Sequence, residues 1–438
     1  MAKPYEIRDP IHGLVQFNDL EREIINSKPF QRLRRIKQLA WTDYVYPGAV
    51  HNRFEHSIGV MHVAGRMFDA LFNDVRSKEI AKSEFSIVDE ELLRLRQMVR
   101  IAALAHDLGH GPFSHAAESL FPRINSENSK RVPHEEYSIC FIKSEISEIL
   151  SAHRTANELA LRPDEISSFI HGVPVDRKIN LLKSLISGSL DSDRMDYLLR
   201  DAYHCGVRYG QYDLERVINT IGICEDNEDE GEFQIGINRD GIHAAEGLLI
   251  ARFMMFTQVY FHKTRVIYDF HIEQALKNML ENVGGVFPDA RSEKGRKEFL
   301  GWDDWRVLGL LAMGKGGEHG EILRNRNHHR LVYETEEFVD GELQVQRADK
   351  KFSKIKNQIT ELGCVERLVT GSWYKQDLRT EILVRRSDGI SAKATQLSNL
   401  SNVVKSLKAV NQKRLYVPEA SRDSAEIKVK AALNLNGE

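Results

Sequence analysis

Residues 101–115, which read IAALAHDLGHGPFSH, place three histidines and an aspartate at the end of one predicted helix. An apolar run with helical spacing leads into His106, Asp107 and His110. Glycine and proline then stop the helix, and His115 follows near the start of the next one. The negative end of a helix dipole favours a bound cation or a protonated imidazole. A polar helix cap is the simpler alternative, and this stretch alone does not decide between them.

A second helix is predicted to begin just after the turn at Pro47. Asn52 can accept hydrogen bonds from the first backbone amides of the helix. Glu55, three residues later, can accept from the backbone amide of Asn52, as in a capping box. Arg53 and His56 are then neighbours on the first turn and face the same space. The segment therefore offers one cation and one imidazole side by side.

A third helix, predicted over residues 190–206 (LDSDRMDYLLRDAYHCG), carries a polar stripe. Asp193, Tyr197 and Asp201 fall at i, i+4 and i+8, and apolar residues between them can serve packing. A solvated acidic face is the alternative. A phenol between two acids with apolar flanks favours a side chain set that lines a cavity.

Two imidazoles and two carboxylates can be drawn from these helices, namely His56, the adjacent pair His106 and Asp107, and Asp193. This nitrogen and oxygen donor set suits one divalent transition metal such as Fe, Mn, Zn, Ni or Co. Coordination positions remain for water and a phosphate oxygen. A metal in such a site lowers the pKa of water and polarises phosphorus, which is what phosphoester hydrolysis requires.

Cationic side chains gather in two further places. Residues 241–263 are predicted as one long helix with Arg252, Phe256, Tyr260 and Lys263 on a single stripe, which suits a polyphosphate and a sugar. The run that contains Arg32, Arg34, Arg35 and Lys37 is more typical of a solvated basic face than of a phosphate or partner site.

Composition limits the class of protein. A chain of 438 residues is long enough for two or three folding units. Lys plus Arg number 61 and Asp plus Glu number 64, so the net charge of −3 gives no global basic field for non-specific nucleic-acid binding. Four cysteines without a CxxC pair predict neither a disulfide framework nor a thiolate zinc site. No apolar run approaches the ~18 residues that span a bilayer, so we expect a cytoplasmic protein without membrane contact.

Five stretches, in this order and over most of residues 5–265, resemble the deoxynucleoside triphosphate (dNTP) triphosphohydrolases of the SAM-and-HD-domain type: FQRLRRIKQLAWTDYVYPGAVHNRFEHSIGV, IAALAHDLGHGPFSH, PHEEYS, LDSDRMDYLLRDAYHCG and VYFHK. These enzymes belong to the HD-domain metal-dependent phosphohydrolases, whose ligand pattern is H…HD…D. No SAM domain precedes the stretches, so we expect the bare catalytic core of the bacterial members.

The resemblance implies a mainly α fold, with an HD-domain helical core and a smaller C-terminal α/β lobe. The expected domains are a catalytic core over residues 1–285 with an acidic hairpin near 220–237, a helical extension over 286–345, and a small α/β lobe and tail over 346–438.

The resemblance also assigns roles to individual residues. The metal ligands are His56, His106, Asp107 and Asp193. The catalytic positions are His115 as acid or base, Glu118 as its partner in place of the more common aspartate, and the phosphate-facing His110 and His134. The substrate-binding positions are Gln38, Leu39, Arg53, Tyr197, Asp201, Arg252, Tyr260 and Lys263.

A nucleotide effector site is implied at Asn26, Gln31 and Arg34. The family has aspartate where this chain has Asn26, and asparagine lacks the carboxylate that accepts both guanine edge donors. A guanine effector is therefore put in doubt, while activation by a nucleotide stays expected.

The expected reaction is water attack on the α-phosphorus of a dNTP, which gives deoxynucleoside and inorganic triphosphate, with Mg²⁺ accompanying the nucleotide. The resemblance further implies a dimer or tetramer. An HD-type nuclease or nucleotide phosphodiesterase is the nearest alternative. A nucleotide- or nucleic-acid-binding regulatory protein is the second, because the basic segments 324–330 and 350–357 could contact single-stranded nucleic acid.

Overall fold

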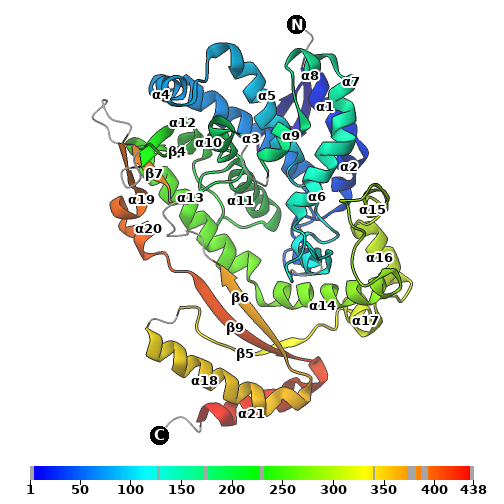
Figure 1. Cartoon of the computed structure of the whole chain (residues 1–438). Coiled ribbons are helices and arrows are strands. Elements are labelled where there is room, and N and C mark those ends of the chain that lie inside the picture. The colour runs from blue at the N-terminus through cyan, green and yellow to red at the C-terminus, as the bar shows by residue number, and fades with distance from the viewer. Residues whose placement is uncertain are drawn as a thin grey trace.

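The computed structural model describes residues 4–125, 129–170, 176–226, 231–338, 341–371, 381–385 and 393–434. The tip of the predicted acidic hairpin, residues 227–230, lies outside the described residues. No described helix combines the length and the apolar character needed to cross a membrane. Figure 1 shows a large helical body that contains the first two thirds of the chain and a smaller lobe with a sheet beneath it.

The chain begins with a hairpin of β1 (Tyr5–Asp9) and β2 (Gly13–Phe17), whose strands are antiparallel. Helix α1 (Asp19–Asn26) follows, because Asn18 and Glu21 form a capping box at its start. Helix α2 (Lys28–Arg32) begins with proline near its first position, where a missing N–H costs nothing.

Three helices form the centre of the body: α3 (Arg53–Asn73), α5 (Asp89–Ala105) and α11 (Ser192–Cys205). The predicted capping box at the start of α3 is confirmed, since the side chain of Asn52 accepts from backbone amides and Glu55 accepts from the amide of Asn52. Helix α3 packs between α5 and α11, so its two faces are both apolar and buried. The remaining helices of this half are α4 (Val75–Phe85), α6 (His134–Phe141), α7 (Ser147–Ala152), α8 (Arg154–Glu158), α9 (Pro163–Ser168), α10 (Arg177–Lys183) and α12 (Leu214–Asn219).

The predicted hairpin near residues 220–237 is confirmed as β3 (Ile221–Asp226) and β4 (Phe233–Asn238). Two short strands from late in the chain, β7 (Leu383–Arg385) and β8 (Lys393–Gln396), pair with it and close a small barrel. Helices α19 (Leu397–Leu400) and α20 (Asn402–Ser406) follow these strands, and Figure 1 shows them beside the helical body.

The prediction of one continuous helix over residues 241–263 is wrong. Helix α13 (Ile242–Met255) passes into a π-helical turn, η6 (Phe256–Tyr260), after which the helical conformation ends. His262 adopts a non-helical conformation, and its side chain accepts from the amide of Thr264, so it caps a new helix, α14 (Lys263–Leu280). Lys263 therefore starts a separate helix and does not continue the stripe of α13.

The basic run between residues 32 and 37 is not a uniform solvated face, since only Arg34 of its four cations is exposed. Arg32 is fully buried and donates from Nε and Nη2 to the carbonyl of Trp302, at 2.9 and 2.7 Å. Arg35 pairs with Asp303 at 2.5 Å. These partners lie just before α16 (Asp304–Ala312), which follows α15 (Glu293–Phe299) and precedes α17 (Gly317–Asn325).

Asp304 joins this late segment to the start of the chain. Its two carboxylate oxygens accept from the backbone amides of Lys37 at 2.8 Å and Phe113 at 2.7 Å. Burial raises the pKa of Asp304 to about 7, although both amides lower it. The two backbone segments that it joins lead directly to Gln38 and Ser114, which line or support the site described below.

Replacing Asp304 with asparagine is expected to change how stability depends on pH. In the wild type the folded state keeps the proton of Asp304 to a higher pH than the unfolded chain does, so this group stabilises the fold most below about pH 4 and loses that contribution as the pH rises to about 7. The free energy of unfolding of the variant, relative to the wild type, should therefore rise by up to about 4 kcal/mol over this range. Denaturant titrations at several pH values measure it, and parallel pH curves for the two proteins would refute it.

The C-terminal lobe is a three-stranded sheet in the order β5 (Arg330–Glu334), β9 (Val410–Val417) and β6 (Val365–Gly371). Helices α18 (Glu342–Ile359) and α21 (Arg422–Asn434) cover it and enclose a small apolar core of their own. In Figure 1 this lobe lies below α14. The predicted mainly α fold with a smaller α/β lobe is confirmed. The domain boundaries stay predictions, and β5 already begins within the expected extension over 286–345.

Candidate metal centre and active site

The four predicted metal ligands converge from three helix ends. His56 lies on the first turn of α3, His106 and Asp107 directly follow α5, and Asp193 lies on the first turn of α11. The Oδ1 atom of Asp193 is 3.0 Å from Nε2 of His56 and 3.8 Å from Nε2 of His106. Oδ1 of Asp107 is 3.2 Å from Nε2 of His106. His56, His106 and Asp193 form a cluster that can hold a metal ion.

The hydrogen bonds of the two histidines favour a metal at their Nε2 atoms. Nδ1 of His56 donates to Asp196 at 2.8 Å, and Nδ1 of His106 donates to the carbonyl of Ala103 at 2.7 Å. With the proton on Nδ1, each Nε2 presents a lone pair. Both Nε2 atoms are buried and have no hydrogen-bond partner among the described residues. Because such orphaned buried atoms are costly, the donor set fits a divalent cation.

The charges of the cluster depend on what fills it. Burial lowers the pKa of the His56 imidazole, but the carboxylates of Asp193 and Asp196 beside its two ring nitrogens raise it overall to about 10. Burial acts against ionisation of Asp193, but the imidazoles of His106 and His56 beside its carboxylate hold its pKa well below the usual value. In the metal-free protein the cluster is therefore held as ion pairs, and a metal would replace protons there.

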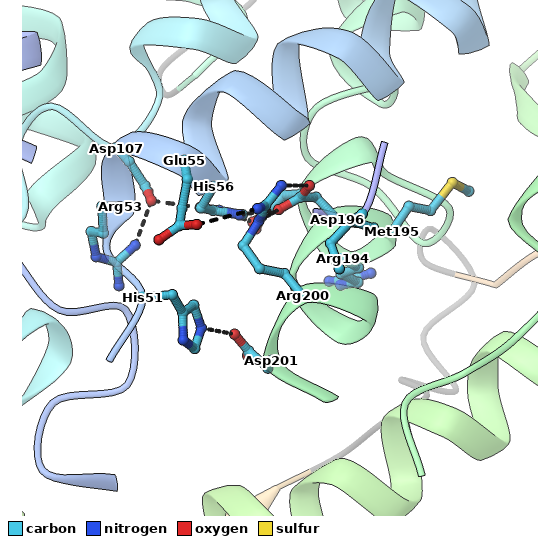
Figure 2. A network of polar contacts seen from close by, with 12 residues as sticks. His51, Arg53, Glu55, His56, Asp107, Arg194, Met195, Asp196, Arg200 and Asp201 are labelled. Atoms are coloured by element: carbon cyan, nitrogen blue, oxygen red, sulfur yellow. Dashed lines mark hydrogen bonds and ion pairs between the residues drawn. The ribbon is translucent and has the colours of Figure 1, made fainter. Parts of the chain in front are cut away.

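Arg53 lies against Asp107 and is fixed in place by its other hydrogen bond. Its guanidinium pairs with the Asp107 carboxylate, and its Nε donates to the hydroxyl of Ser114 at 2.8 Å. That hydroxyl in turn donates to the carbonyl of Lys37 at 2.7 Å. Figure 2 shows Arg53 and Asp107 beside His56, with the arginine oriented toward the carboxylate. A fixed positive charge therefore adjoins the metal ligands.

The predicted catalytic residues form a second cluster next to the first. Glu118 accepts from Nδ1 of His115 and Nδ1 of His134, both at 2.8 Å. The rings of His110 and His134 stack with centroids 3.7 Å apart. Gly109 makes this approach possible, because a Cβ there would lie 2.0 Å from the carbonyl oxygen of His134.

The three histidines of this cluster differ in environment. Burial, followed by the nearby Arg53, lowers the pKa of His110, so that its ring is neutral. Burial lowers the pKa of His134, but the hydrogen bond to Glu118 raises it overall. The His115 side chain is 62% exposed, in contrast to 1% for His110, so His115 is the member of the cluster that a substrate can reach most easily.

A cavity of about 290 Å³ joins the two clusters. Of the predicted residues, it is lined by Gln38, Arg53, His106, Asp107, His110, His115, His134, Asp193 and Tyr197. Ile170, Ile186, Ser187 and Glu135 also line it and were missed, because three of them come from segments that carry no polar motif. The lining of the cavity is thus mostly charged and polar, with Ile170 and Ile186 as its apolar members.

The predicted sugar contacts lie together beside this cavity. The hydroxyl of Tyr260 donates to Asp201 at 2.7 Å, and Nε2 of His51 contacts the other carboxylate oxygen at 2.7 Å. Tyr197 and Tyr260 face each other with ring centroids 6.2 Å apart. His51 was missed by the sequence analysis, since one histidine in a turn carries no local signal. Leu39, also predicted here, is an apolar core residue.

The two remaining predicted cations are not placed alike. The guanidinium of Arg252 lies 5.5 Å from the centre of the Phe256 ring, and burial, opposed by the nearby Tyr197, lowers its pKa. Lys263 instead lines a second cavity of about 200 Å³ with His328, Arg330 and Tyr416, among others. The break before α14 accounts for this separation, and the assignment of Lys263 to the substrate triphosphate stays a prediction that this placement does not favour.

The predicted effector residues share one corner of the helical body. Gln31 donates to the carbonyl of Ile25 at 2.7 Å, and Nε of Arg34 donates to the side-chain oxygen of Gln31 at 3.0 Å. The guanidinium of Arg34 also lies 3.4 Å from the centre of the Phe54 ring, and Asn26 is exposed nearby at the end of α1. Their role in nucleotide binding stays a prediction.

This fold and donor set define the protein class, a helical HD metal-binding core. The HD-domain profile matches residues 53–187, and the HD-associated region matches residues 212–438, just over half of the chain. A crystal structure of a hypothetical protein from Aquifex aeolicus is 30% identical and has a TM-score of 0.76, with 98% of this chain and 100% of that chain covered. The chain therefore belongs to the HD-domain family, among the members with an HD-associated region.

The regions of similarity to curated relatives cover only part of each relative's length. The uncharacterized protein YwfO of Bacillus subtilis is 37% identical over 58% of this chain and 51% of its own. The deoxynucleoside triphosphate triphosphohydrolase SAMHD1 homolog of Dictyostelium discoideum is 34% identical over 75% of this chain and 60% of its own. The human SAMHD1 is 36% identical over 51% of this chain and 37% of its own. The chain spans about half the length of the Bacillus relative.

Proposed function

We propose that this protein is a metal-dependent phosphohydrolase that converts dNTPs to deoxynucleoside and inorganic triphosphate. The observation that carries the proposal is the pair of buried Nε2 atoms of His56 and His106 beside Asp193. His106 and Asp193 line a cavity that Arg53 and a histidine cluster also line. Relatives named as deoxynucleoside triphosphate triphosphohydrolases support the substrate class.

We assign the following roles to the residues around the metal site. His56, His106, Asp107 and Asp193 would hold the divalent cation, for which we propose Fe, Mn, Zn, Ni or Co. When bound, such an ion activates water and polarises the phosphoryl group. Arg53 adds a fixed positive charge where negative charge develops on the α-phosphoryl oxygens.

His115 is the proposed general acid. As the bond from water oxygen to the α-phosphorus forms, the bond from phosphorus to the 5′-oxygen breaks, and the proton of His115 passes to that oxygen. Glu118 holds Nδ1 of His115, so the other ring nitrogen carries the transferable proton toward the cavity. The buried neutral ring of His110 and the ring of His134 then remain available to contact the phosphates.

The sugar contacts favour a free nucleoside end over a polynucleotide chain. Asp201 has both carboxylate oxygens in hydrogen bonds, to His51 and Tyr260, so it is held rigidly as an acceptor for a sugar hydroxyl. A nuclease needs room for the next nucleotide at the 3′ side. We propose that Tyr260, which is itself buried and donates to Asp201, closes that side.

The reaction is tested by product analysis. Purified protein, stripped of metal and reloaded with one ion of the series at a time, is incubated with each dNTP and Mg²⁺, with and without a second nucleotide as effector. Anion-exchange chromatography should show triphosphate and deoxynucleoside in equal amounts. Pyrophosphate with monophosphate would indicate the phosphodiesterase alternative, and no product with any metal and effector would refute the enzyme.

We also propose that a nucleotide effector activates the enzyme and that it acts as a homo-oligomer in the cytoplasm. Size-exclusion chromatography with light scattering, repeated with each nucleotide, checks the oligomer. If none of the nucleotides changes either the mass of the protein or its turnover, this part of the proposal is wrong.

A further inference from the structure

The N-terminal hairpin contacts the proposed metal site through a residue that lies before the HD-domain match. We propose that His12, in the turn between β1 and β2, is a positioning residue that fixes the orientation of the ligand His56 through Asp196. The inference rests on the metal site proposed above. It adds to that site two residues, His12 and Asp196, that lie outside residues 53–187.

Asp196 is the centre of this arrangement. Nδ1 of His56 donates to its Oδ2 at 2.8 Å, and Nε2 of His12 donates to its Oδ1 at 2.7 Å. Nε and Nη2 of Arg200 each donate to one of the oxygens at 2.8 Å. The carboxylate is completely buried and each oxygen receives two donors, so it has no freedom to rotate. The ring of His56 is therefore fixed, with Nε2 facing His106 and Asp193.

His12 is itself held by the turn in which it lies. Oδ1 of Asp9 accepts from the amides of Ile11 at 2.8 Å and His12 at 2.9 Å, and Oδ2 accepts from Nη1 of Arg200 at 2.8 Å. Arg200 thus connects Asp9 on the hairpin with Asp196 on α11. Figure 2 shows Arg200 lying across Asp196 close to His56, with Glu55 on the other side of its guanidinium. The hairpin turn and the start of α11 form one rigid support.

Helix α3 has a glycine at the point where Asp196 and Arg200 approach it. Gly59 lies one turn beyond His56, and a Cβ there would be 1.9 Å from Oδ1 of Asp196 and 2.4 Å from Nη2 of Arg200. Any larger residue would push the carboxylate away from His56. Glycine is unfavourable in the middle of a helix, so its presence here is accounted for by the approach of Asp196.

Removing the His12 donor should release one side of the carboxylate. Oδ1 of Asp196 would then keep only Arg200 as a partner, and the carboxylate could turn toward the guanidinium and away from Nδ1 of His56. Hydrogen-bond partners of metal-ligating histidines typically change metal affinity by about 10–100-fold when they are lost. A purely structural hairpin residue would lower stability without this specific effect.

The test is the affinity of the full chain, stripped of metal, for Mn²⁺, measured by electron paramagnetic resonance of the free ion. His12→Leu should weaken Mn²⁺ binding by about tenfold or more. His12→Gln, whose amide nitrogen can reach Asp196 as Nε2 does, should stay within about threefold of the wild type. If His12→Leu does not fold, His12→Asn replaces it, because the shorter amide cannot reach the carboxylate.

Val15→Ala is the matched control. Val15 lies buried in β2 of the same hairpin, and its apolar side chain cannot donate a hydrogen bond to Asp196. Its truncation should therefore lower the midpoint of thermal unfolding and leave Mn²⁺ affinity unchanged. Wild-type affinity in His12→Leu, or an equal loss in Val15→Ala at the same thermal shift, would overturn the role of His12 and leave the metal site standing. A wild type that binds neither Mn²⁺ nor, by metal analysis, any other ion of the proposed series would overturn both.

Discussion

Replacing Asp193 with asparagine is expected to remove metal binding and turnover while the fold survives. Oδ1 of Asp193 lies 3.0 Å from Nε2 of His56, so the substitution removes the charged ligand that faces both histidines and leaves a neutral amide. Metal affinity should fall by more than about 100-fold. Turnover should fall on the order of 1,000-fold, since a metal supplies several kcal/mol of charge stabilisation in the transition state. Metal content by mass spectrometry and the rate of triphosphate release measure the two effects.

Asp193 is a better target than the pair His106 and Asp107. Its side chain is 37% exposed, whereas Asp107 is the buried partner of the buried Arg53. Removing Asp107 would leave that guanidinium without its counter-charge, which typically costs about 3–5 kcal/mol and confuses loss of metal with loss of fold. A dNTP-binding assay on Asp193→Asn completes the experiment. Retained binding with lost turnover supports the enzyme, and retained metal with wild-type turnover would exclude Asp193 as a ligand.

Replacing His115 with alanine is expected to lower kcat by about 100- to 10,000-fold without loss of metal, because the leaving 5′-oxygen then departs without a proton donor. Steady-state rates over a range of pH, together with metal content, give both results.

The chain offers a close control for His115. Nδ1 of His243 contacts Glu246 at 2.8 Å three residues later, which repeats the pairing of His115 with Glu118, on an exposed surface that no predicted site residue shares. His243→Ala should therefore leave kcat and its pH profile unchanged. If His115→Ala keeps kcat within about threefold of the wild type, another group must protonate the leaving oxygen.

The parts of the site that could be predicted from the sequence are those with local signals. The capping box of Asn52 and Glu55 fixed the start of α3, so Arg53 and His56 could be placed on one face. Helical spacing put Asp193, Tyr197 and Asp201 on one side of α11, and the structure places Asp193 and Tyr197 at the cavity. The roles of these residues stay predictions.

The parts that could not be predicted depend on partners far away in the chain. Arg32 is of a residue type that is usually exposed, and its burial depends on partners from a distant part of the chain, the carbonyl of Trp302 and the ring of Phe299. His12 and Asp196 are separated by 184 residues, and two of the central helices, α3 and α5, come between them in the chain order. The break at His262 depends on a side-chain cap that no apolar spacing reveals. Tertiary contacts decided each of these cases.

The most direct test of the account is the fate of the oxygen that comes from water. The wild-type enzyme, loaded with its preferred metal, is supplied with a dNTP in water enriched in oxygen-18, and both products are analysed by mass spectrometry. Attack on the α-phosphorus predicts one labelled oxygen in the triphosphate and none in the deoxynucleoside. Label in the 5′-hydroxyl of the deoxynucleoside, or in pyrophosphate or a nucleoside monophosphate, would contradict the proposed reaction.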